Sequence, residues 1–322
     1  MNVDKTITQE LIINSLLKSS SNYLKLFVEF QSNLLSNIYK RYSSVENGYL
    51  VLFFAKEVHQ SILRNKDYDI NFDVSFESFW KNHEKINPNK NSIIDISKIT
   101  FMPKETVRRK IMHLVNKKVL DKRNKRLGFF PNEKYKFDYN EFINKEIIEL
   151  SNVISLVSSK IENYISPAEV QNAIKHNFSF FWFHYLDSQL KFISLWKKKV
   201  SDLELMLISY QCLAATISKL SKDNLSLDEI NKKYNSKNFL NNSTISATSI
   251  SDITGIPRAT CLRKLDNLAK LKIVKKDETT KRFFLTKESI NAEGLASWEF
   301  MKKSMEIFGN FYLICLRTIY SK

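Results

Sequence analysis

The sequence predicts a mostly α-helical protein in which one helical unit occurs twice. The chain has 322 residues, of which 43% are hydrophobic, five are glycine and five are proline. Helix-breaking residues are few, and apolar residues recur at helical spacing, so helices are favoured over strands. Residues 96–130 align with residues 250–284 without a gap, and 13 of the 35 positions are identical. This fixed offset of 154 residues indicates a tandem repeat, with domains expected at 1–150 and 151–322.

Each unit is expected to begin with two long helices. Apolar residues at helical spacing predict them at about 22–42 and 49–64 in the first unit. The corresponding helices of the second unit are expected at about 176–198 and 203–219. The same offset pairs apolar positions in these segments, which supports a repeat longer than the aligned segment.

A short helix and a long closing helix are expected further along each unit. Ser75 and Ser226 precede acidic and apolar residues, a pattern typical of a helix N-terminus. Apolar periodicity predicts the closing helices at about 140–163 and 289–319.

A basic motif lies between these elements in each unit. We call residues 92–136 the first motif and residues 246–290 the second motif. In the second motif, "TSISDIT" (248–254) predicts a short helix, and Gly255 can adopt the positive φ of a sharp turn. Pro257 then stands where a helix begins, a position at which its missing N–H does no harm.

The helix that follows has an apolar stripe and a basic face. Cys261, Leu265 and Leu268 are spaced to lie on one side, against a core. The other face is expected to carry Arg258, Thr260, Arg263, Lys264 and Asn267. Two helices joined by a tight turn, with the second one basic, form a helix-turn-helix arrangement.

A small β-hairpin is expected after this helix in both motifs. β-prone residues at 271–276 and 281–286 flank the turn-like "DETT" in the second motif. The first motif shows the same order, with strands at 118–122 and 126–131 around "RNK". The first motif has Phe101 where the second has Gly255, so its turn between helices is expected to differ in shape.

The segment "GIPRATCLRKLDNL" and the hairpin after it resemble the winged helix-turn-helix of bacterial transcription regulators, such as the MarR, IclR and Crp-type families. The resemblance covers about 45 residues in each half of the chain. It implies a bacterial or phage protein in which the second helix contacts base edges in the major groove of double-stranded DNA and the hairpin is a wing.

Candidate DNA-binding residues follow from this resemblance. The base-reading candidates are Lys104, Arg108, Arg109, Arg258 and Arg263. The phosphate-contact candidates are Lys122, Arg123, Lys125, Arg126, Lys281 and Arg282. Thr106, Lys110, Thr260 and Lys264 complete the candidate set on the two helices. The second wing tip carries the acidic pair Asp277–Glu278, so the first wing is the better candidate to enter a DNA groove.

The distribution of charge agrees with nucleic-acid binding. Residues 96–136 carry a net charge of +10 and residues 250–290 carry +5, so almost all of the formal +16 lies on the two motifs. Because the motifs differ at their base-facing positions, we expect one chain to act as a covalent pseudo-dimer on two unequal half-sites about one helical turn apart. A replication initiator with two winged helices is the nearest alternative, and an architectural or protein-contact factor is another.

Two features leave alternatives open. The aromatic segment 177–196 is expected to be a buried core or dimer helix, and the alternative is a ligand pocket lined by Phe178, Trp182, Tyr185 and Trp196. A homodimer and a small-molecule effector therefore stay open as partners. Cys261 is expected to be a core residue, and the alternative is a redox-sensing thiol whose pKa Arg263 and Lys264 lower.

The sequence does not favour an enzyme. Its five histidines and three cysteines show no metal-ligand spacing, and its few glycines form no phosphate-binding loop, so we expect no metal or cofactor. Widely spaced cysteines, no secretory signal pattern and no apolar run of about 20 residues favour a cytoplasmic protein that does not enter a membrane.

Overall fold

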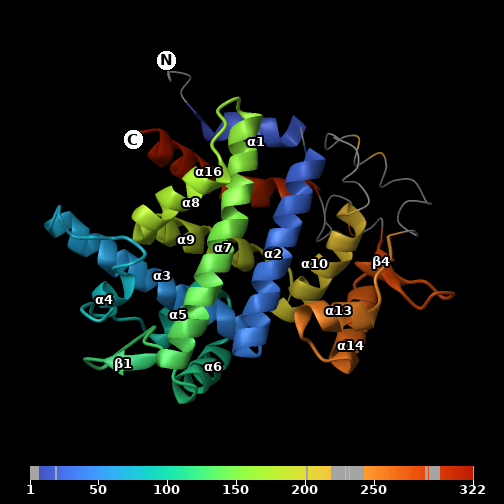
Figure 1. Ribbon diagram of the computed structural model, residues 1–322. Helices are drawn as coiled ribbons and strands as arrows, with labels where there is room; N and C mark the ends of the chain where they lie inside the picture. The colour runs from blue at the N-terminus through green and yellow to red at the C-terminus, as the bar shows by residue number, and fades with distance from the viewer. Residues whose placement is uncertain are drawn as a thin grey trace. The chain divides into compact units, whose positions relative to one another are not determined.

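The protein is mostly helical, with two small antiparallel hairpins (Figure 1). The computed structural model describes residues 7–18, 20–200, 202–218, 243–286 and 298–321, together with Glu229, Lys232 and Ser289. None of the helices in these segments is long and apolar enough to cross a membrane.

The chain forms two compact units, each built from separate stretches of sequence. Unit 1 comprises Met1–Lys40, Asn152–Ile165 and Lys199–Lys322. Unit 2 comprises Arg41–Ser151 and Ser166–Lys198.

These units do not follow the predicted boundary between residues 150 and 151. Unit 1 holds the second motif together with most of the first long helix, α2 (Ser20–Tyr42). Unit 2 holds the first motif together with α9 (Phe178–Lys197), the long helix of the second repeat. Each motif is thus grouped with the long helix of the other repeat. Packing decides this grouping, because an apolar helix face can be buried against either copy.

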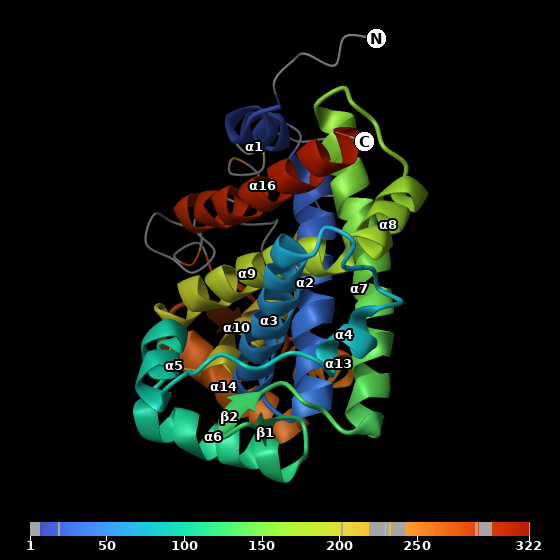
Figure 2. The ribbon, with the colours of Figure 1, turned by 90° about the vertical axis from the view of Figure 1, so that its left-hand side faces the viewer.

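Unit 2 contains most of the first repeat. Its elements are α3 (Val45–Tyr68), α4 (Phe79–His83), α5 (Ile93–Thr100), α6 (Lys104–Asn116), β1 (Asp121–Arg123), β2 (Arg126–Gly128), the first part of α7 (Glu133–Lys160), α8 (Pro167–His176) and α9. The core of the unit lies where α3 packs against α9 (Figure 2). Tyr49 and Phe54 on α3 and Trp182 and Phe192 on α9 are fully buried, so these two helices are apolar on most sides.

Unit 1 contains the chain termini and the second motif. Its elements are α1 (Gln9–Lys18), most of α2, α10 (Leu203–Ile217), α13 (Ala247–Thr254), α14 (Arg258–Lys270), β3 (Val274–Lys276), β4 (Phe283–Leu285) and α16 (Trp298–Tyr320). The helix α10 packs against α13, α14 and β4. The helix α1 lies close to α16, where a Cβ at Gly309 would stand 3.1 Å from Ile13.

The predicted order of elements is largely confirmed. The long helices begin and end within a few residues of their expected bounds, and the short helix after Ser75 is α4. The closing helix of the first repeat, α7, begins earlier than predicted, at Glu133. The short helix predicted after Ser226 and the start of the closing helix predicted from 289 lie largely outside the described residues.

Candidate nucleic-acid interface

The two motifs contain the same pair of helices at matching positions. The first helices, α5 and α13, have 8 residues each, and the second helices, α6 and α14, have 13 each. Each helix of the second motif begins and ends 154 residues after its counterpart in the first motif, as the sequence alignment predicts. Ser92 and Ser246 begin the first helices in the same way, because each hydroxyl accepts a hydrogen bond from the third helical residue's amide.

The turns between the helices also match, which corrects the expectation for Phe101. Phe101 has φ 54° and Gly255 has φ 78°, so both residues adopt the left-handed conformation. A side chain at such a position costs roughly 1–2 kcal/mol. The Phe101 ring lies 4.6 Å from the Lys198 ammonium nitrogen, and the next residue, Met102, is buried. These contacts help to hold the turn in the same shape without glycine.

The inner faces of α6 and α14 pack against the core as predicted. Cys261, Leu265 and Leu268 are fully buried on α14. Burial raises the pKa of the Cys261 thiol to about 11. Cys261 is thus the core residue that the sequence predicts, and the alternative of a thiol whose pKa neighbouring cations lower is contradicted.

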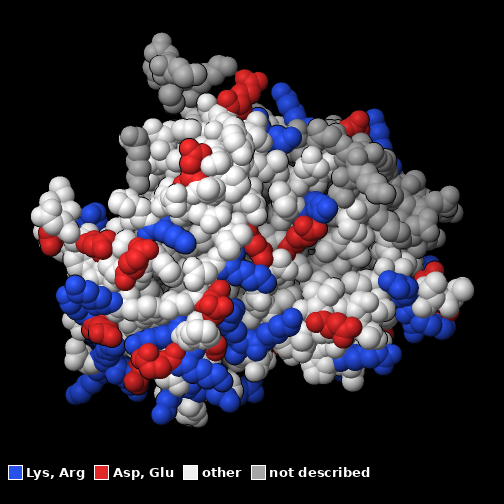
Figure 3. Space-filling model, viewed as in Figure 1, with Lys and Arg blue, Asp and Glu red and all other residues white. Residues whose placement is uncertain are grey.

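The outer face of α6 carries three exposed cations. Lys104, Arg108 and Arg109 are exposed, and Thr106 is half-buried. Arg108 lies 3.4 Å from the exposed Glu105, a weak ion pair. Within the described part of the chain, the side chains of Lys104 and Arg109 have no hydrogen-bond or ion-pair partner. Figure 3 shows lysine and arginine side chains gathered over the part of unit 2 that contains α5, α6 and β1.

The outer face of α14 carries fewer free cations. Arg258 and Arg263 are exposed, and Thr260 is half-buried. Arg258 donates a hydrogen bond to the Thr248 hydroxyl at 3.1 Å. The Arg263 side chain has no polar partner among the described residues.

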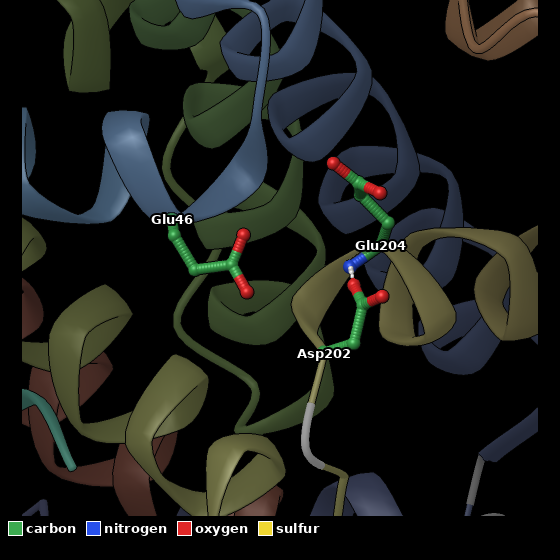
Figure 4. A group of neighbouring side chains, drawn as sticks. All are labelled: Glu46, Asp202 and Glu204. Atoms are coloured by element: carbon green, nitrogen blue, oxygen red, sulfur yellow. Dashed lines mark hydrogen bonds between the residues drawn. The ribbon is translucent and has the colours of Figure 1, made fainter. Parts of the chain in front are cut away.

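Lys264 does not lie on this outer face, so its predicted place there is wrong. It is 4% exposed and contacts two carboxylates at the N-terminus of α10. Asp202 caps that helix by accepting a hydrogen bond from the Glu204 amide at 2.8 Å (Figure 4). The Lys264 ammonium pairs with Asp202 and lies 2.7 Å from Glu204. Burial alone would lower the pKa of Lys264, but the two carboxylates outweigh it and raise the pKa.

Lys110 occupies the matching position in the first motif and makes the matching contact. Its ammonium lies 3.2 Å from the hydroxyl of Ser44, the residue that caps α3, and 3.8 Å from Glu46 in the first turn. In both units this lysine joins the basic helix to the N-terminus of a long helix. The spacing in the sequence could have indicated this role. Lys110 lies three residues after the buried Val107, and Lys264 lies three residues after the buried Cys261.

The first hairpin presents two free lysines near its tip. β1 and β2 pair antiparallel, and Asn124 and Lys125 form the turn with positive φ angles of 51° and 62°. Such a two-residue turn fits the twist of a hairpin. Lys122 and Lys125 are exposed, and neither side chain has a polar partner in the described residues. The strands are shorter than predicted.

The two arginines of this hairpin are engaged with the protein. The Arg123 guanidinium stacks 3.8 Å from the Phe130 ring and donates to the Glu84 carbonyl at 3.0 Å. Arg126 is exposed and makes one long contact, 3.4 Å, to the Pro88 carbonyl. Arg123 therefore supports the hairpin, and Arg126 is more available than Arg123 for a phosphate contact.

The second hairpin has a longer loop and fewer free cations. β3 and β4 pair with Lys276 opposite Phe283, which leaves residues 277–282 in the loop. Asp277 accepts hydrogen bonds from the Thr280 and Thr279 amides, which lower its pKa, so this acidic residue orders its own turn. Of the two predicted phosphate contacts, Lys281 pairs with Glu278 at 3.2 Å and Arg282 donates to the Thr244 carbonyl.

The aromatic residues of α9 pack inside unit 2, as the core interpretation predicts. Phe178, Trp182 and Tyr185 are fully buried, and Trp196 is 3% exposed. The Trp182 indole donates to the Tyr139 hydroxyl at 3.2 Å, and the Tyr185 hydroxyl donates to the Glu146 carboxyl. A cavity of about 390 Å³ in this unit lies elsewhere, beside the first hairpin.

No protein-family model, curated protein or solved structure matches this chain. The candidate interface is therefore assigned from its own residues, their exposure and their contacts.

Proposed function

We propose that this protein is a transcription regulator that binds double-stranded DNA through two unlike winged helix-turn-helix modules. One observation carries the proposal. In each unit, a 13-residue helix follows a tight left-handed turn and precedes a small hairpin. The exposed arginines of this helix point away from the core. This combination is the geometry with which such modules place a helix in the major groove.

The first motif is the stronger DNA-binding surface. Lys104, Arg108 and Arg109 lie on the exposed face of α6, where they can reach base edges. Lys122 and Lys125 at the hairpin tip can approach phosphates, which releases counterions and makes binding salt-dependent. The side-chain contacts of Lys110 with Ser44 and Glu46 at the N-terminus of α3 keep α6 in a fixed orientation toward the DNA.

The second motif reads DNA with fewer charges. Arg258 and Arg263 are its base-reading residues, and an arginine paired with guanine is worth about 1–3 kcal/mol of discrimination. Lys281 and Arg282 must give up contacts within the protein to reach phosphates. This motif therefore contributes sequence preference more than it contributes salt-dependent affinity.

Two unlike readers in one chain predict two unlike half-sites. The early positions of α6 carry Lys104, Glu105 and Arg108, and the matching positions of α14 carry Arg258, Ala259 and Leu262. A single chain would act as a covalent pseudo-dimer, so an asymmetric site needs no second molecule.

Selection from a random-sequence duplex pool at two salt concentrations tests this function. The wild-type protein should enrich a motif with two unlike halves, and an Arg109→Ala/Arg263→Ala variant should lose that preference. Lys145→Ala, which removes an exposed lysine of α7 that pairs with Glu149 on the same helix, is the matched control and should select the wild-type motif.

Other outcomes would favour other functions. An iterated target would point to a replication initiator, and salt-sensitive binding without a motif would point to an architectural protein. Absence of binding at low salt would contradict any DNA-binding function.

A further inference from the structure

A cavity of about 390 Å³ lies between α5, α6 and the first hairpin, entirely within unit 2. Its volume falls in the range of small-ligand sites, roughly 300–1,000 Å³. Its walls come from both faces that the proposed function uses, the helix α6 and the hairpin.

The interior of the cavity is apolar and aliphatic. The apolar side chains that line it are Ile93, Ile96, Ile111, Met112, Val115 and Leu127. None of the lining residues is aromatic. Branched aliphatic side chains and an adaptable thioether suit a flexible alkyl chain better than a flat ring.

The rim of the cavity is strongly basic. The charged residues that line it are Lys90, Arg108, Lys122, Lys125 and Arg126, and no acidic residue lines it. Two asparagines, Asn91 and Asn116, are the other polar members. Several cations around an apolar interior favour a ligand that has an anionic head and an apolar body.

The second motif differs at the matching place. There Ile245 and Phe283 exchange two backbone hydrogen bonds of 2.8 Å, so the segment before α13 pairs with the hairpin. In the first motif the corresponding residue, Asn91, bonds to Glu57 through its side chain and lines the cavity instead.

The charges at the matching positions differ as well. Leu262 and Asp266 of α14 stand where α6 has Arg108 and Met112. At these two positions alone, an anion would therefore lose one cation and meet one carboxylate in the second motif.

We infer that the cavity beside the first hairpin binds a small amphipathic anion, namely an alkyl chain of medium length that ends in a carboxylate or a phosphate. The head would contact Arg108, Lys122, Lys125 or Arg126, and the chain would lie against Ile111, Met112 and Val115. Because the proposed function uses the same cations on DNA, the bound anion would weaken DNA binding by the first motif. That competition rests on the proposed function, whereas the site itself does not.

Methyl NMR on the 322-residue chain without DNA can locate the ligand. With ¹³C-methyl methionine, octanoate and octyl phosphate should shift the Met112 signal saturably, and a Met112→Leu variant assigns that signal. Neutral octanol tests the role of the rim cations and should bind at least about tenfold more weakly. The two anions separate a carboxylate from a phosphate ligand.

Calorimetry on variants tests the cavity walls. Val115→Phe fills the interior and should abolish binding, whereas Ala269→Phe, at the matching position of α14, should leave it unchanged. Met112→Asp copies the second motif at a side chain that is 60% exposed, so it should fold, and it should weaken binding about tenfold or more.

Three results would overturn the site: no Met112 shift with either anion, equal affinity for octanol, or unchanged affinity in Met112→Asp. A DNA titration with saturating octyl phosphate then tests competition. Unchanged DNA affinity would contradict the competition, and absence of DNA binding would contradict the proposed function while calorimetry still decides the site.

Discussion

The two motifs share a backbone but differ in the surface that surrounds it. In both motifs, a short helix, a left-handed turn and a 13-residue helix follow one another, and the matching elements lie 154 residues apart. The first hairpin turns over two residues and leaves a basic cavity beside α6, whereas the second has a longer, partly acidic loop and pairs with Ile245. Buried positions that the repeats share therefore maintain the scaffold, and exposed positions that differ change the charge of the outward surface.

The lysine shared by the two motifs illustrates this division. Lys110 and Lys264 both bind the capped N-terminus of a long helix, yet the first is partly exposed and the second is buried. The shared contact fixes the helix, and its burial decides how much stability depends on it.

Replacing either of these two lysines should lower stability, and burial separates the two effects. Lys264→Ala leaves two carboxylates without their buried cation and should lower the free energy of unfolding by about 3 kcal/mol. Lys110→Ala removes a partly exposed contact and should cost less than about 1 kcal/mol. Urea denaturation measures the free energy of unfolding of both variants. Equal losses would contradict the claim that the buried Lys264 matters more for stability than the partly exposed Lys110.

A second difference between the units concerns pH. Burial raises the pKa of Glu146 to about 8 in unit 2, and the matching position of unit 1 is the buried Phe300. Because the folded pKa lies above the unfolded value, the neutral carboxyl stabilises unit 2 at low pH, and this stability is lost as the pH rises toward 8.

Glu146→Gln should remove this loss. Between pH 5 and 8, wild-type stability should fall relative to the variant by at most about 1.4 kcal/mol per pH unit. Thermal unfolding over this range measures the difference, and parallel curves would show that Glu146 is ionised in the folded protein.

The turns between the helices offer a third comparison. Gly255→Ala places a Cβ at a positive φ and 3.0 Å from the Lys40 side chain, so it should destabilise unit 1 by roughly 1–2 kcal/mol. Phe101→Gly relieves the same strain in unit 2 but loses the contact with Lys198, so it should change stability by less than about 1 kcal/mol. Chemical denaturation distinguishes the two, and a large loss in Phe101→Gly would show that the ring holds the turn.

The smallest expected effect compares the hairpins. Lys122→Ala/Lys125→Ala should reduce the salt dependence of DNA binding by about two phosphate contacts. Lys281→Ala/Arg282→Ala should reduce it by about one contact or less, because both side chains already have partners in the protein. Fluorescence anisotropy at several salt concentrations gives both slopes, and a larger change for the second pair would reverse the assignment of the stronger wing.

The sequence predicts the local features of this fold well. Helical spacing, a positive-φ glycine, a helix-starting proline and β-prone segments each act over a few residues, so the helix pairs and hairpins are found near their expected positions. The left-handed Phe101 was missed because glycine preference is only a preference, and packing around Met102 and Lys198 offsets the strain.

Features that depend on distant residues could not be predicted. The grouping of α9 with the first motif depends on which copy its apolar face meets, and the repeat makes both copies acceptable partners. Burial of Lys264 requires Asp202 and Glu204, which are about 60 residues away in sequence. The cavity beside the first hairpin depends on Asn91 not pairing with that hairpin, a contact that no local pattern encodes.

The most direct test of the two-reader claim repeats the duplex selection with two single variants. Arg109→Ala should lose preference in one half of the enriched site only, and Arg263→Ala should lose preference in the other half only. Loss of the same half in both variants, or an unchanged site in both, would contradict a protein that reads DNA with two unlike motifs.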